Sequence, residues 1–440
     1  MSDASELTRQ QAKRRPRFDY RNQSHLSAHA GKLAPAQPIP DHPLIPKTAP
    51  AMISSPDGLM ELIDHIRSVG RFAYDSEFIG EMSYLPKLCL IQVATAQRVA
   101  LVDSLAELDL TEFWKLIADA SIEKVVHCGQ QDLEPIFRHL SQPPARVFDT
   151  QVAAGFIGLA YPVGLSKLVR ELTGVHLGKG FTFTHWDQRP LSNVQIRYAA
   201  DDVRYLPAVR EAIGKRLEAL GHLGWVEEEC AGLCDPSLYR MDEAADFMRI
   251  RGANALSPQG LAVLRELYVW RESAARAQDS PPRSYLRDEV LVELSRKPLT
   301  AVEGLSKVRG LPRPVEISEG VNMVAATQRG LAVLEAQRPA AKQTEETPTE
   351  RFGIDSLWAM VQAWCAGQGV DPALVSSRQE IARLYREVGA QGSPAEDGRL
   401  MRGWRGQLIG KRLREFLGGG SFIQLGWKKG ALRSSNGMRG

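Results

Sequence analysis

Alternating and helical hydrophobic patterns follow one another between residues 51 and 222. Residues 71–78 (RFAYDSEF) alternate in polarity as a β-strand does, because successive side chains of a strand point to opposite faces. The same patterns predict further strands at 88–94, 98–102, 124–127 and 146–148, and helices at 110–118, 133–140, 149–158 and 164–173. Strands that alternate with helices in this way indicate a mixed sheet covered by helices.

The end of this α/β region is marked by a helix start and a proline. Ser192 and Gln195 have the spacing of a capping box, in which the two side chains bond to backbone N–H groups at the start of a helix. The helix is predicted to run through Tyr205. Pro207 lacks a backbone N–H, so we expect a kink or a restart there, followed by a helix to about Leu220.

Beyond residue 237 the hydrophobic pattern is helical only. Amphipathic segments such as 260–277 and 286–295 predict a first helical domain at 237–336, followed by a polar linker at 337–351 and a second helical domain at 352–418. Residues 1–50 are rich in Pro and basic residues and lack hydrophobic periodicity, so we predict a disordered arm there. A basic tail at 419–440 follows the second helical domain.

The composition adds to this predicted domain organisation only through the local distribution of charge. The 440 residues are 43% hydrophobic and 24% charged, which are ordinary globular values, and the formal net charge is +3. Basic residues concentrate between 401 and 440, where Glu415 is the one acid: Arg402, Arg405, Lys411, Arg412, Arg414, Lys428, Lys429, Arg433 and Arg439. Such a segment suits a polyanionic partner.

The cysteine count and the hydropathy indicate a compartment. Five cysteines are an odd number without the spacing of a zinc site, which favours a reducing environment. No stretch approaches the ~20 apolar residues that a membrane span needs. We therefore expect a cytoplasmic protein without a membrane segment, acting as a monomer.

Two carboxylates are predicted to share one face of the strand at 71–78. Asp75 and Glu77 alternate with Phe72, Tyr74 and Phe78, so the acids lie on one side and the aromatic residues on the other. Adjacent carboxylates repel each other and raise each other's pKa unless a cation lies between them. A divalent metal would remove that conflict, although Asp-x-Glu alone is more often a solvated strand end.

Two later segments carry further candidate residues. VVHCGQQDL places Asp132 where a strand runs into a helix, and IRYAADDVRYL places Tyr198 and Asp202 four residues apart on one helical face. Taken singly, Asp132 is more often a helix cap and Tyr198 more often a core residue. Asp201 points about 100° away from Asp202 on an α-helix, so we leave it out of the site.

Together these segments resemble the DEDD superfamily of 3′-5′ exonucleases, whose motifs are Asp-x-Glu, an Asp at a strand-to-helix junction, and Tyr-x3-Asp. The runs YLPKLCLIQVA, FDTQVAAGF, GLSKLV and HWDQRPLSNVQIRYAADDVRYLP extend the resemblance to ribonuclease D over most of residues 70–210. A sister subfamily has His five residues before the last Asp, where this chain has Arg197, so the tyrosine subtype is favoured.

Residues 256–335 resemble the HRDC domain, in the Trp-Arg pair at 270–271, the Asp-x-Pro-Pro turn and the Leu-x-Asp-Glu helix start. Residues 352–418 look like a second, more divergent copy. The alternative is a purely structural helical bundle. The resemblance therefore implies an α/β ribonuclease H-like exonuclease domain, a mixed sheet flanked by helices at 51–222, followed by two all-α HRDC domains.

The resemblance also implies a reaction and its residues. Two divalent cations, Mg²⁺ or Mn²⁺, would be held by Asp75, Glu77, Asp132 and Asp202, and Tyr198 would orient the attacking water. The enzyme would trim 3′ ends of structured RNA such as tRNA precursors, act on a single-stranded 3′ end, and release nucleoside 5′-monophosphates. Two alternatives remain open: a 3′-5′ DNA exonuclease, and a non-catalytic RNA-binding protein on the same fold.

Residues around this centre receive weaker predictions. Asp149 is expected to be a helix N-cap rather than a metal ligand, and His127 a hydrogen-bonded histidine near the sheet. The loop before Trp186 departs from the family that the chain resembles, because His185 and Phe183 stand where that family usually has an acidic residue and, nearby, an Arg. The candidate contacts to nucleic acid are Gln92, Trp186, Arg309, Arg405, Lys411 and Arg412.

Overall fold

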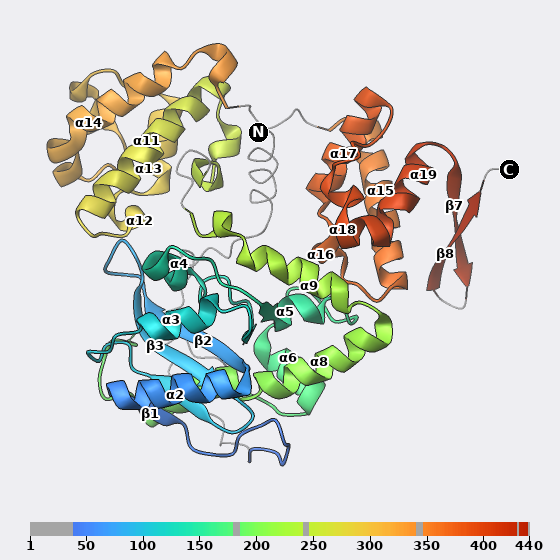
Figure 1. The fold of residues 1–440 in the computed structure, drawn as a ribbon. Coiled ribbons are helices and arrows are strands. Elements are labelled where there is room, and N and C mark those ends of the chain that lie inside the picture. Colours follow the sequence, from blue (N-terminus) through green and yellow to red (C-terminus); the bar gives the residue numbers. More distant parts are fainter. Residues whose placement is uncertain (1–37, 179–184, 241–245, 340–345, 429–430, 439–440) are drawn as a thin grey trace.

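The computed structural model describes residues 38–178, 185–240, 246–339, 346–428 and 431–438, with side chains described to residue 420. An α/β domain lies at the bottom of the view in Figure 1, and two helical units lie above it on opposite sides. The first helical unit (yellow to orange) lies above α4, and the second (red) lies above α5 and α9.

The α/β domain is built on a six-stranded mixed sheet with the order β1-β4-β3-β2-β5-β6. β3 is antiparallel to both of its neighbours, whereas the pairs β1–β4, β2–β5 and β5–β6 are parallel. The strands are β1 (Ala51–Ile53), β2 (Arg71–Ile79), β3 (Lys87–Ala94), β4 (Val99–Val102), β5 (Glu123–Val126) and β6 (Val147–Asp149). The predicted mixed sheet is confirmed, except that the three-residue β1 is too short for its alternation to be recognised.

Helices cover both faces of the sheet. They are α2 (Pro56–Val69), α3 (Thr111–Ala118), α4 (Glu134–Leu140), α5 (Thr150–Ala154), α6 (Leu165–Thr173), α7 (Asn193–Arg204), α8 (Leu206–Leu220) and α9 (Leu223–Ala231). The capping box at α7 is present, because Ser192 Oγ accepts from Gln195 N and the Gln195 side chain accepts from Ser192 N. The predicted break also occurs, since α8 begins anew with Pro207 in its first turn.

The segment 38–50 differs from the predicted disordered arm. Ile45 is only 2% exposed and packs in the same hydrophobic core as α5 and α8. The Arg204 guanidinium of α7 donates to the carbonyl of Pro46 and, over 3.2 Å, to that of Thr48. These contacts depend on residues about 160 positions apart, so local periodicity could not reveal them; the rest of the predicted arm, 1–37, lies outside the described residues.

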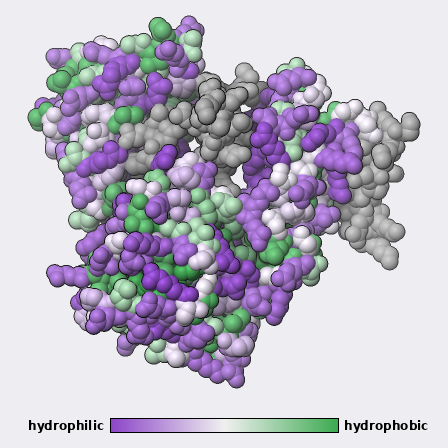
Figure 2. Space-filling view, in the orientation of Figure 1, coloured by the Kyte–Doolittle hydropathy of each residue, from purple (hydrophilic) through white to green (hydrophobic). Residues whose placement is uncertain are grey.

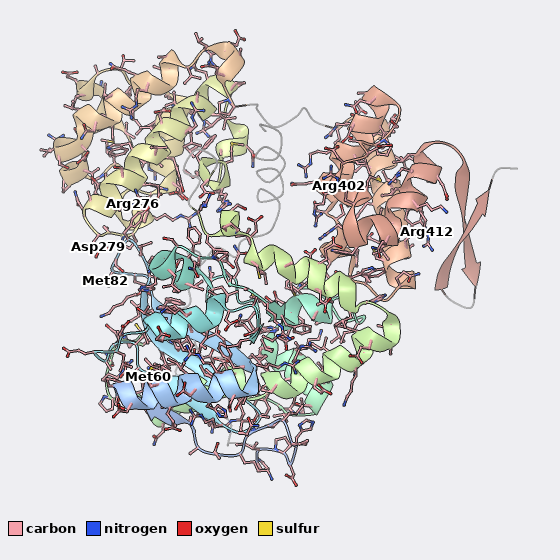
Figure 3. All side chains as sticks on the ribbon, in the orientation of Figure 1. Met60, Met82, Arg276, Asp279, Arg402 and Arg412 are labelled. Carbon is pink, nitrogen blue, oxygen red and sulfur yellow. The ribbon has the colours of Figure 1, made fainter. Side chains whose placement is uncertain are left out.

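The first helical unit contains α11 (Pro258–Ala277), α12 (Pro282–Tyr285), α13 (Asp288–Arg296) and α14 (Arg313–Ala332). It contacts the α/β domain through Tyr84 in the loop between β2 and β3. The Tyr84 Oη donates to Glu272 Oε2 over 3.1 Å, the Tyr84 N donates to Asp279 Oδ1 over 3.0 Å, and the Arg276 guanidinium lies 5.0 Å from the ring centroid. Figure 3 shows Arg276 and Asp279 beside this loop, which also carries the exposed Met82.

The second helical unit shares its core with the α/β domain. Its helices are α15 (Pro348–Gly367), α16 (Pro372–Val375), α17 (Arg378–Gln391), α18 (Gly403–Arg405) and α19 (Lys411–Leu417). The Asp371 N donates to Gly155 O over 2.8 Å, and Tyr161 N donates to Asp371 Oδ2 over 3.0 Å. A Cβ on Gly155 would lie 2.5 Å from Leu374 Cδ1, so a side chain here would have to displace the side chain of Leu374. The helices were predicted, but their common core with the α/β domain was not.

The predicted basic tail contains a β-hairpin. β7 (Ser421–Lys428) and β8 (Ala431–Met438) pair as antiparallel strands. The sequence carried a signal for the first strand, because Ile423, Leu425 and Trp427 alternate with Gln, Gly and Lys. The predicted basic tail therefore contains two paired strands, which were not predicted.

The visible surface is mostly hydrophilic over both helical units (Figure 2). The most exposed large apolar side chains are Met82, Ile317, Val321, Leu334 and Phe352, of which Ile317 and Val321 lie one turn apart on α14. None of the described helices combines the length and the apolar character that a membrane crossing requires.

Candidate metal centre

Three acidic side chains converge where α7 crosses the sheet. Asp75 and Glu77 lie on β2, Asp202 lies on α7, and one carboxylate oxygen of each falls within 4.8 Å of the others. Strand alternation places the first two on one face, and α7 packs against β2, β3 and β4 on that face. The structure thus brings together three of the four predicted ligands. Asp201 stays outside this group and lies 3.5 Å from the Arg204 guanidinium, as its helical position predicts.

Asp132 reaches this region from the open edge of β2. The pairing of β2 with β5 stops at Ala73 and Val125, so the turn after β5 occupies the next stretch of the β2 edge. The Tyr74 Oη donates to the carbonyl of Asp132 over 2.7 Å, and the Ser76 Oγ donates to Asp132 Oδ1 over 2.6 Å. Asp132 is not a helix cap, because α4 starts after Leu133 without a capping side chain.

Tyr198 lies one turn before Asp202 and donates a hydrogen bond to its carboxylate. Burial, followed by the charges of Asp202 and Glu77, raises the pKa of Tyr198 well above its usual value. The phenol therefore keeps its proton at any working pH. The ring of Trp186 lies 6.2 Å from that of Tyr198, centroid to centroid, and Trp186 is only 2% exposed.

The charged forms of the four acids are disfavoured, because the carboxylates are desolvated and repel one another. Burial raises the pKa of Asp75 and of Asp202 well above the ordinary value; Asp132 then adds most to the first and Glu77 to the second. Burial and the charge of Asp75 raise the pKa of Glu77. Burial also raises the pKa of Asp132 to about 6, against the Ser76 hydrogen bond, which lowers it.

These residues fit a divalent cation. Among the described residues, no Lys or Arg forms an ion pair with any of the four acids, so their charge lacks a protein counter-ion. Gln92 is the cross-strand neighbour of Asp75 on β3, is fully buried, and both polar atoms of its carboxamide lack a partner among the described residues. A concentrated set of oxygen ligands with net negative charge is what Mg²⁺ and Mn²⁺ prefer.

The repulsion predicts how stability depends on pH. Between the ordinary Asp pKa near 3.8 and the raised value of about 6 for Asp132, the folded protein binds more protons than the unfolded chain. These carboxyl groups therefore lower the stability of the metal-free protein as pH rises through that window, and a bound cation offsets the loss. We expect Mn²⁺ to raise the melting temperature more at pH 7.5 than at pH 5, measured by differential scanning fluorimetry against EDTA. An equal shift at both pH values would contradict this account.

Asp149 has the predicted capping role and a second one. Its carboxylate accepts from Gln151 N and Val152 N at the start of α5, over 2.8 and 3.4 Å. It also accepts from Cys128 N and Gly129 N, over 3.1 and 3.2 Å, and so fixes the turn that leads to Asp132. No sequence pattern indicated this second role, because the two segments are about 20 residues apart.

His127, in the same turn, also has the predicted role. Its Nδ1 lies 3.0 Å from Thr150 Oγ1, and Thr150 Oγ1 donates to Val126 O. Thr150 can therefore only accept from His127, which makes Nδ1 the donor. Burial lowers the pKa of His127, so the ring is neutral.

Three of the predicted nucleic-acid contacts are corrected by burial. Gln92 is fully buried, and Trp186 packs against Tyr198. Arg405 is 7% exposed, because its guanidinium donates to Glu229 Oε2 over 2.8 Å and to the carbonyl of Leu374 over 2.6 Å. The basic segment around Arg405 suggested that this residue lies on the surface. The sequence could not reveal the pairing, because Glu229 lies far away in the chain.

The other predicted contacts remain on the surface. Arg309, Lys411 and Arg412 are exposed, and Lys411 lies 3.9 Å from Glu415. Figure 3 shows Arg412 and Arg402 on the second helical unit. His185 is exposed, and its carbonyl accepts from Gln195 Nε2 over 3.3 Å. Phe183 lies outside the described residues.

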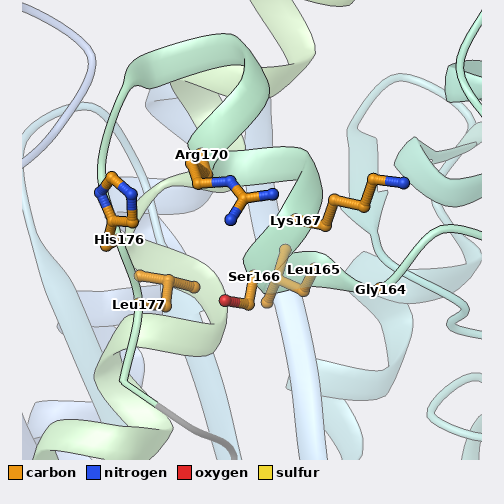
Figure 4. A pocket seen from close by; sticks show the side chains of 7 residues that line it. All are labelled: Gly164, Leu165, Ser166, Lys167, Arg170, His176 and Leu177. Atoms are coloured by element: carbon orange, nitrogen blue, oxygen red, sulfur yellow. The ribbon is translucent and has the colours of Figure 1, made fainter.

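A hollow of about 500 Å³ lies at the start of α6 and was not predicted. Its lining includes Ser166, Lys167, Arg170 and His176, and Figure 4 shows the Arg170 guanidinium between His176 and Lys167. Among the described residues neither Lys167 nor Arg170 forms an ion pair, and neither belongs to the acidic cluster. The hollow is therefore a cationic surface feature separate from the four acids.

Sequence models of two known protein families match parts of this chain. A sequence model described as "3'-5' exonuclease" matches residues 50–218, and one described as "HRDC domain" matches residues 260–316. The second helical unit lies outside the HRDC match, so its assignment as an HRDC copy stays a prediction.

Relatives match over most of the chain. The ribonuclease D of Gluconacetobacter diazotrophicus is 34% identical over 364 residues, which cover 82% of this chain and 91% of that protein. The ribonuclease D of Acidiphilium cryptum is 34% identical over 378 residues, covering 84% and 93%. The crystal structure of Escherichia coli RNase D, described as an exoribonuclease involved in structured RNA processing, superposes with a TM-score of 0.73 at 27% identity, covering 84% of this chain and 99% of that one.

Proposed function

The chain belongs to the ribonuclease D family of 3′-5′ exoribonucleases, and on that premise we propose that it shortens structured RNA at the centre formed by Asp75, Glu77, Asp132 and Asp202. The observation that carries the proposal is the convergence of Asp75, Glu77 and Asp202 within 4.8 Å, where the charge of Asp132 repels that of Asp75 and no Lys or Arg of the described residues pairs with these acids. All of the acids that the exonuclease motifs predict are present. A non-catalytic RNA-binding protein would have no need of this costly arrangement.

Two divalent cations, Mg²⁺ or Mn²⁺, would be held by the four acids and would supply positive charge for the phosphodiester and for an attacking water. The residues of the chain have the remaining tasks. Tyr198 keeps its proton, donates it in a hydrogen bond to Asp202, and can accept a hydrogen bond from a water, so it orients that water rather than deprotonating it. The buried Trp186 fixes the Tyr198 ring.

The substrate we propose is RNA with a single-stranded 3′ end next to a folded part, such as a tRNA precursor. Asp75, Glu77 and Asp202 are only partly exposed between α7 and the sheet, so a single strand reaches them more easily than a duplex does. Exposed cations on both helical units, such as Arg309 and Arg412, would contact phosphates without reading sequence.

The direct test uses the full chain and a 3′-extended tRNA transcript labelled at its 5′ end, with single-stranded DNA of the same sequence beside it. We expect stepwise shortening of the RNA in Mg²⁺ or Mn²⁺, release of nucleoside 5′-monophosphates, and no reaction in EDTA. Faster shortening of DNA would favour the DNA exonuclease. RNA binding without shortening in either metal would favour the binding protein.

A Tyr198→Phe variant tests the role of the phenol. Phenylalanine keeps the ring beside Trp186 but loses the hydroxyl that bonds to Asp202. We expect the single-turnover rate to fall about 10²-fold, a typical size for one positioned proton-handling group, with RNA affinity changed less than about threefold. The measurement is a rapid-quench time course at saturating enzyme. A rate equal to wild type would remove Tyr198 from the reaction.

A further inference from the structure

Ser76 lies between two of the acids in sequence but faces away from them. Strand alternation places Ser76 on the side of Tyr74, opposite Asp75 and Glu77. It is 4% exposed on a face otherwise made of apolar core residues, so its hydroxyl needs a partner. That partner is Asp132, whose Oδ1 accepts from Ser76 Oγ over 2.6 Å.

The fourth acid is therefore held differently from the other three. Asp75, Glu77 and Asp202 are placed by a regular strand and a regular helix that pack against each other. Asp132 lies in an irregular turn and depends on specific hydrogen bonds. The Tyr74 Oη fixes its carbonyl, and the Ser76 hydroxyl is a side-chain donor to its carboxylate, beside the backbone N–H groups of Ser76 and Asp132.

The Ser76 hydroxyl restricts the direction of the Asp132 carboxylate. Oδ1 accepts from Ser76 Oγ, and among the described residues no other side chain donates to this carboxylate. Without the hydroxyl, the carboxylate would keep only its backbone N–H partners, and its rotamer about the Cα–Cβ bond would be less restricted.

We propose that Ser76 is a positioning residue that orients Asp132 independently of the other three acids, so that loss of its hydroxyl weakens one cation position and spares the other. The proposal rests on the function proposed above. Because Ser76 lies on the opposite face of the strand, it would act on a bound cation only through Asp132.

The decisive comparison is Ser76→Thr with Ser76→Val, because the two side chains have nearly the same shape and differ in the hydroxyl. Both are β-branched and suit a strand interior. Ser76→Ala adds a smaller variant without the hydroxyl. Ser295→Ala is the matched control, since Ser295 is also buried, its hydroxyl donates to Leu291 O over 2.7 Å within α13, and it lies in the first helical unit away from the acids.

The experiment is calorimetric titration of Mn²⁺ into each metal-free, full-length protein, with melting curves to check folding. We expect two ions in wild type, Ser76→Thr and Ser295→Ala. In Ser76→Val and Ser76→Ala we expect one ion bound within about threefold of wild type and the other weakened about tenfold or more, which corresponds to about 1.4 kcal/mol.

Three outcomes would overturn the inference. Two ions bound by Ser76→Val as by wild type would show that Asp132 needs no hydroxyl, and equal weakening of both ions would show that Ser76 does not act on one position. Equal loss in Ser76→Thr and Ser76→Val would show that shape, not the hydroxyl, matters. In each case the proposed function stands, whereas wild-type protein that binds no Mn²⁺ would overturn the metal centre itself and the inference with it.

Discussion

An Asp75→Asn variant is expected to shorten RNA at least about 10³-fold more slowly than wild type and, without metal, to melt at a higher temperature. The rate falls because asparagine removes the negative charge at the centre of the proposed ligand set, and 10³-fold corresponds to about 4 kcal/mol of transition-state stabilisation. The melting temperature rises because Asp75 is a half-buried charge whose pKa is raised by desolvation and by Asp132 and Asp202. A gain in stability with a loss of activity is the signature of a strained functional site.

The matched control is Asp201→Asn, which removes an adjacent acid that faces Arg204 instead of the cluster. It should keep nearly the wild-type rate and gain less stability than Asp75→Asn, because Arg204 offsets part of the burial cost of Asp201. The measurements are single-turnover rates in Mn²⁺ and melting curves in EDTA, where each kcal/mol moves a domain of 150 to 250 residues by about 2–4 °C. An Asp75→Asn protein that melts lower than wild type in EDTA would refute the repulsion argument even if its activity were lost.

A Trp404→Ala variant is expected to lower the free energy of unfolding by about 3–5 kcal/mol, the usual range for a buried tryptophan. Trp404 on α18 is fully buried, its ring lies 4.7 Å from that of Phe156, and its Nε1 donates to Glu229 Oε2 over 2.9 Å. Phe156 and Glu229 belong to the α/β side of the shared core. The loss should therefore reach the α/β domain as well as the second helical unit.

The test is unfolding in urea. It is followed by tryptophan fluorescence and, in parallel, by the loss of RNA shortening. Both probes should report one transition in wild type and in Trp404→Ala, at a lower urea concentration in the variant. Phe352→Ala removes an aromatic residue of the same helical unit that is 76% exposed, and it should leave the midpoint unchanged. Activity that survives to the wild-type urea concentration would show that the two parts unfold separately.

The sequence predicted correctly those relations between side chains that follow from the periodicity of a single strand or helix. A period of two places Asp75 beside Glu77, and a period of 3.6 places Tyr198 above Asp202 and turns Asp201 away. Both relations hold within a single element, so they appear in the sequence without knowledge of the fold.

Relations between distant segments were not predictable in this way. Asp149 fixes the turn before Asp132, Ser76 binds Asp132 from a strand 56 residues earlier, and Arg405 pairs with Glu229 across 176 residues. Each of these contacts depends on tertiary packing. Polarity alone favoured the surface for Arg405 and for Gln92, and in both cases tertiary packing buries the residue.

Domain boundaries show the same limit. The helical pattern predicted the helices of the second unit, yet α15 to α19 bury the same core as α5 and α8. Removal of that unit would expose apolar surface of the α/β domain. RNA-binding tests by truncation are therefore less informative than substitutions of exposed cations such as Arg309 and Arg412.

The Tyr84 contact has a consequence for the length of the β2–β3 loop. Hairpin loops generally tolerate insertions and deletions, because their tips contact solvent. Here the loop follows β2 directly, and its tyrosine is buried against Glu272 and Arg276 of another part of the chain. Added residues would have to bulge without moving Tyr84, so we expect homologous chains with this contact to keep the loop length constant. For the same reason, a circular permutation, a protease site or a fluorescent label is better introduced elsewhere.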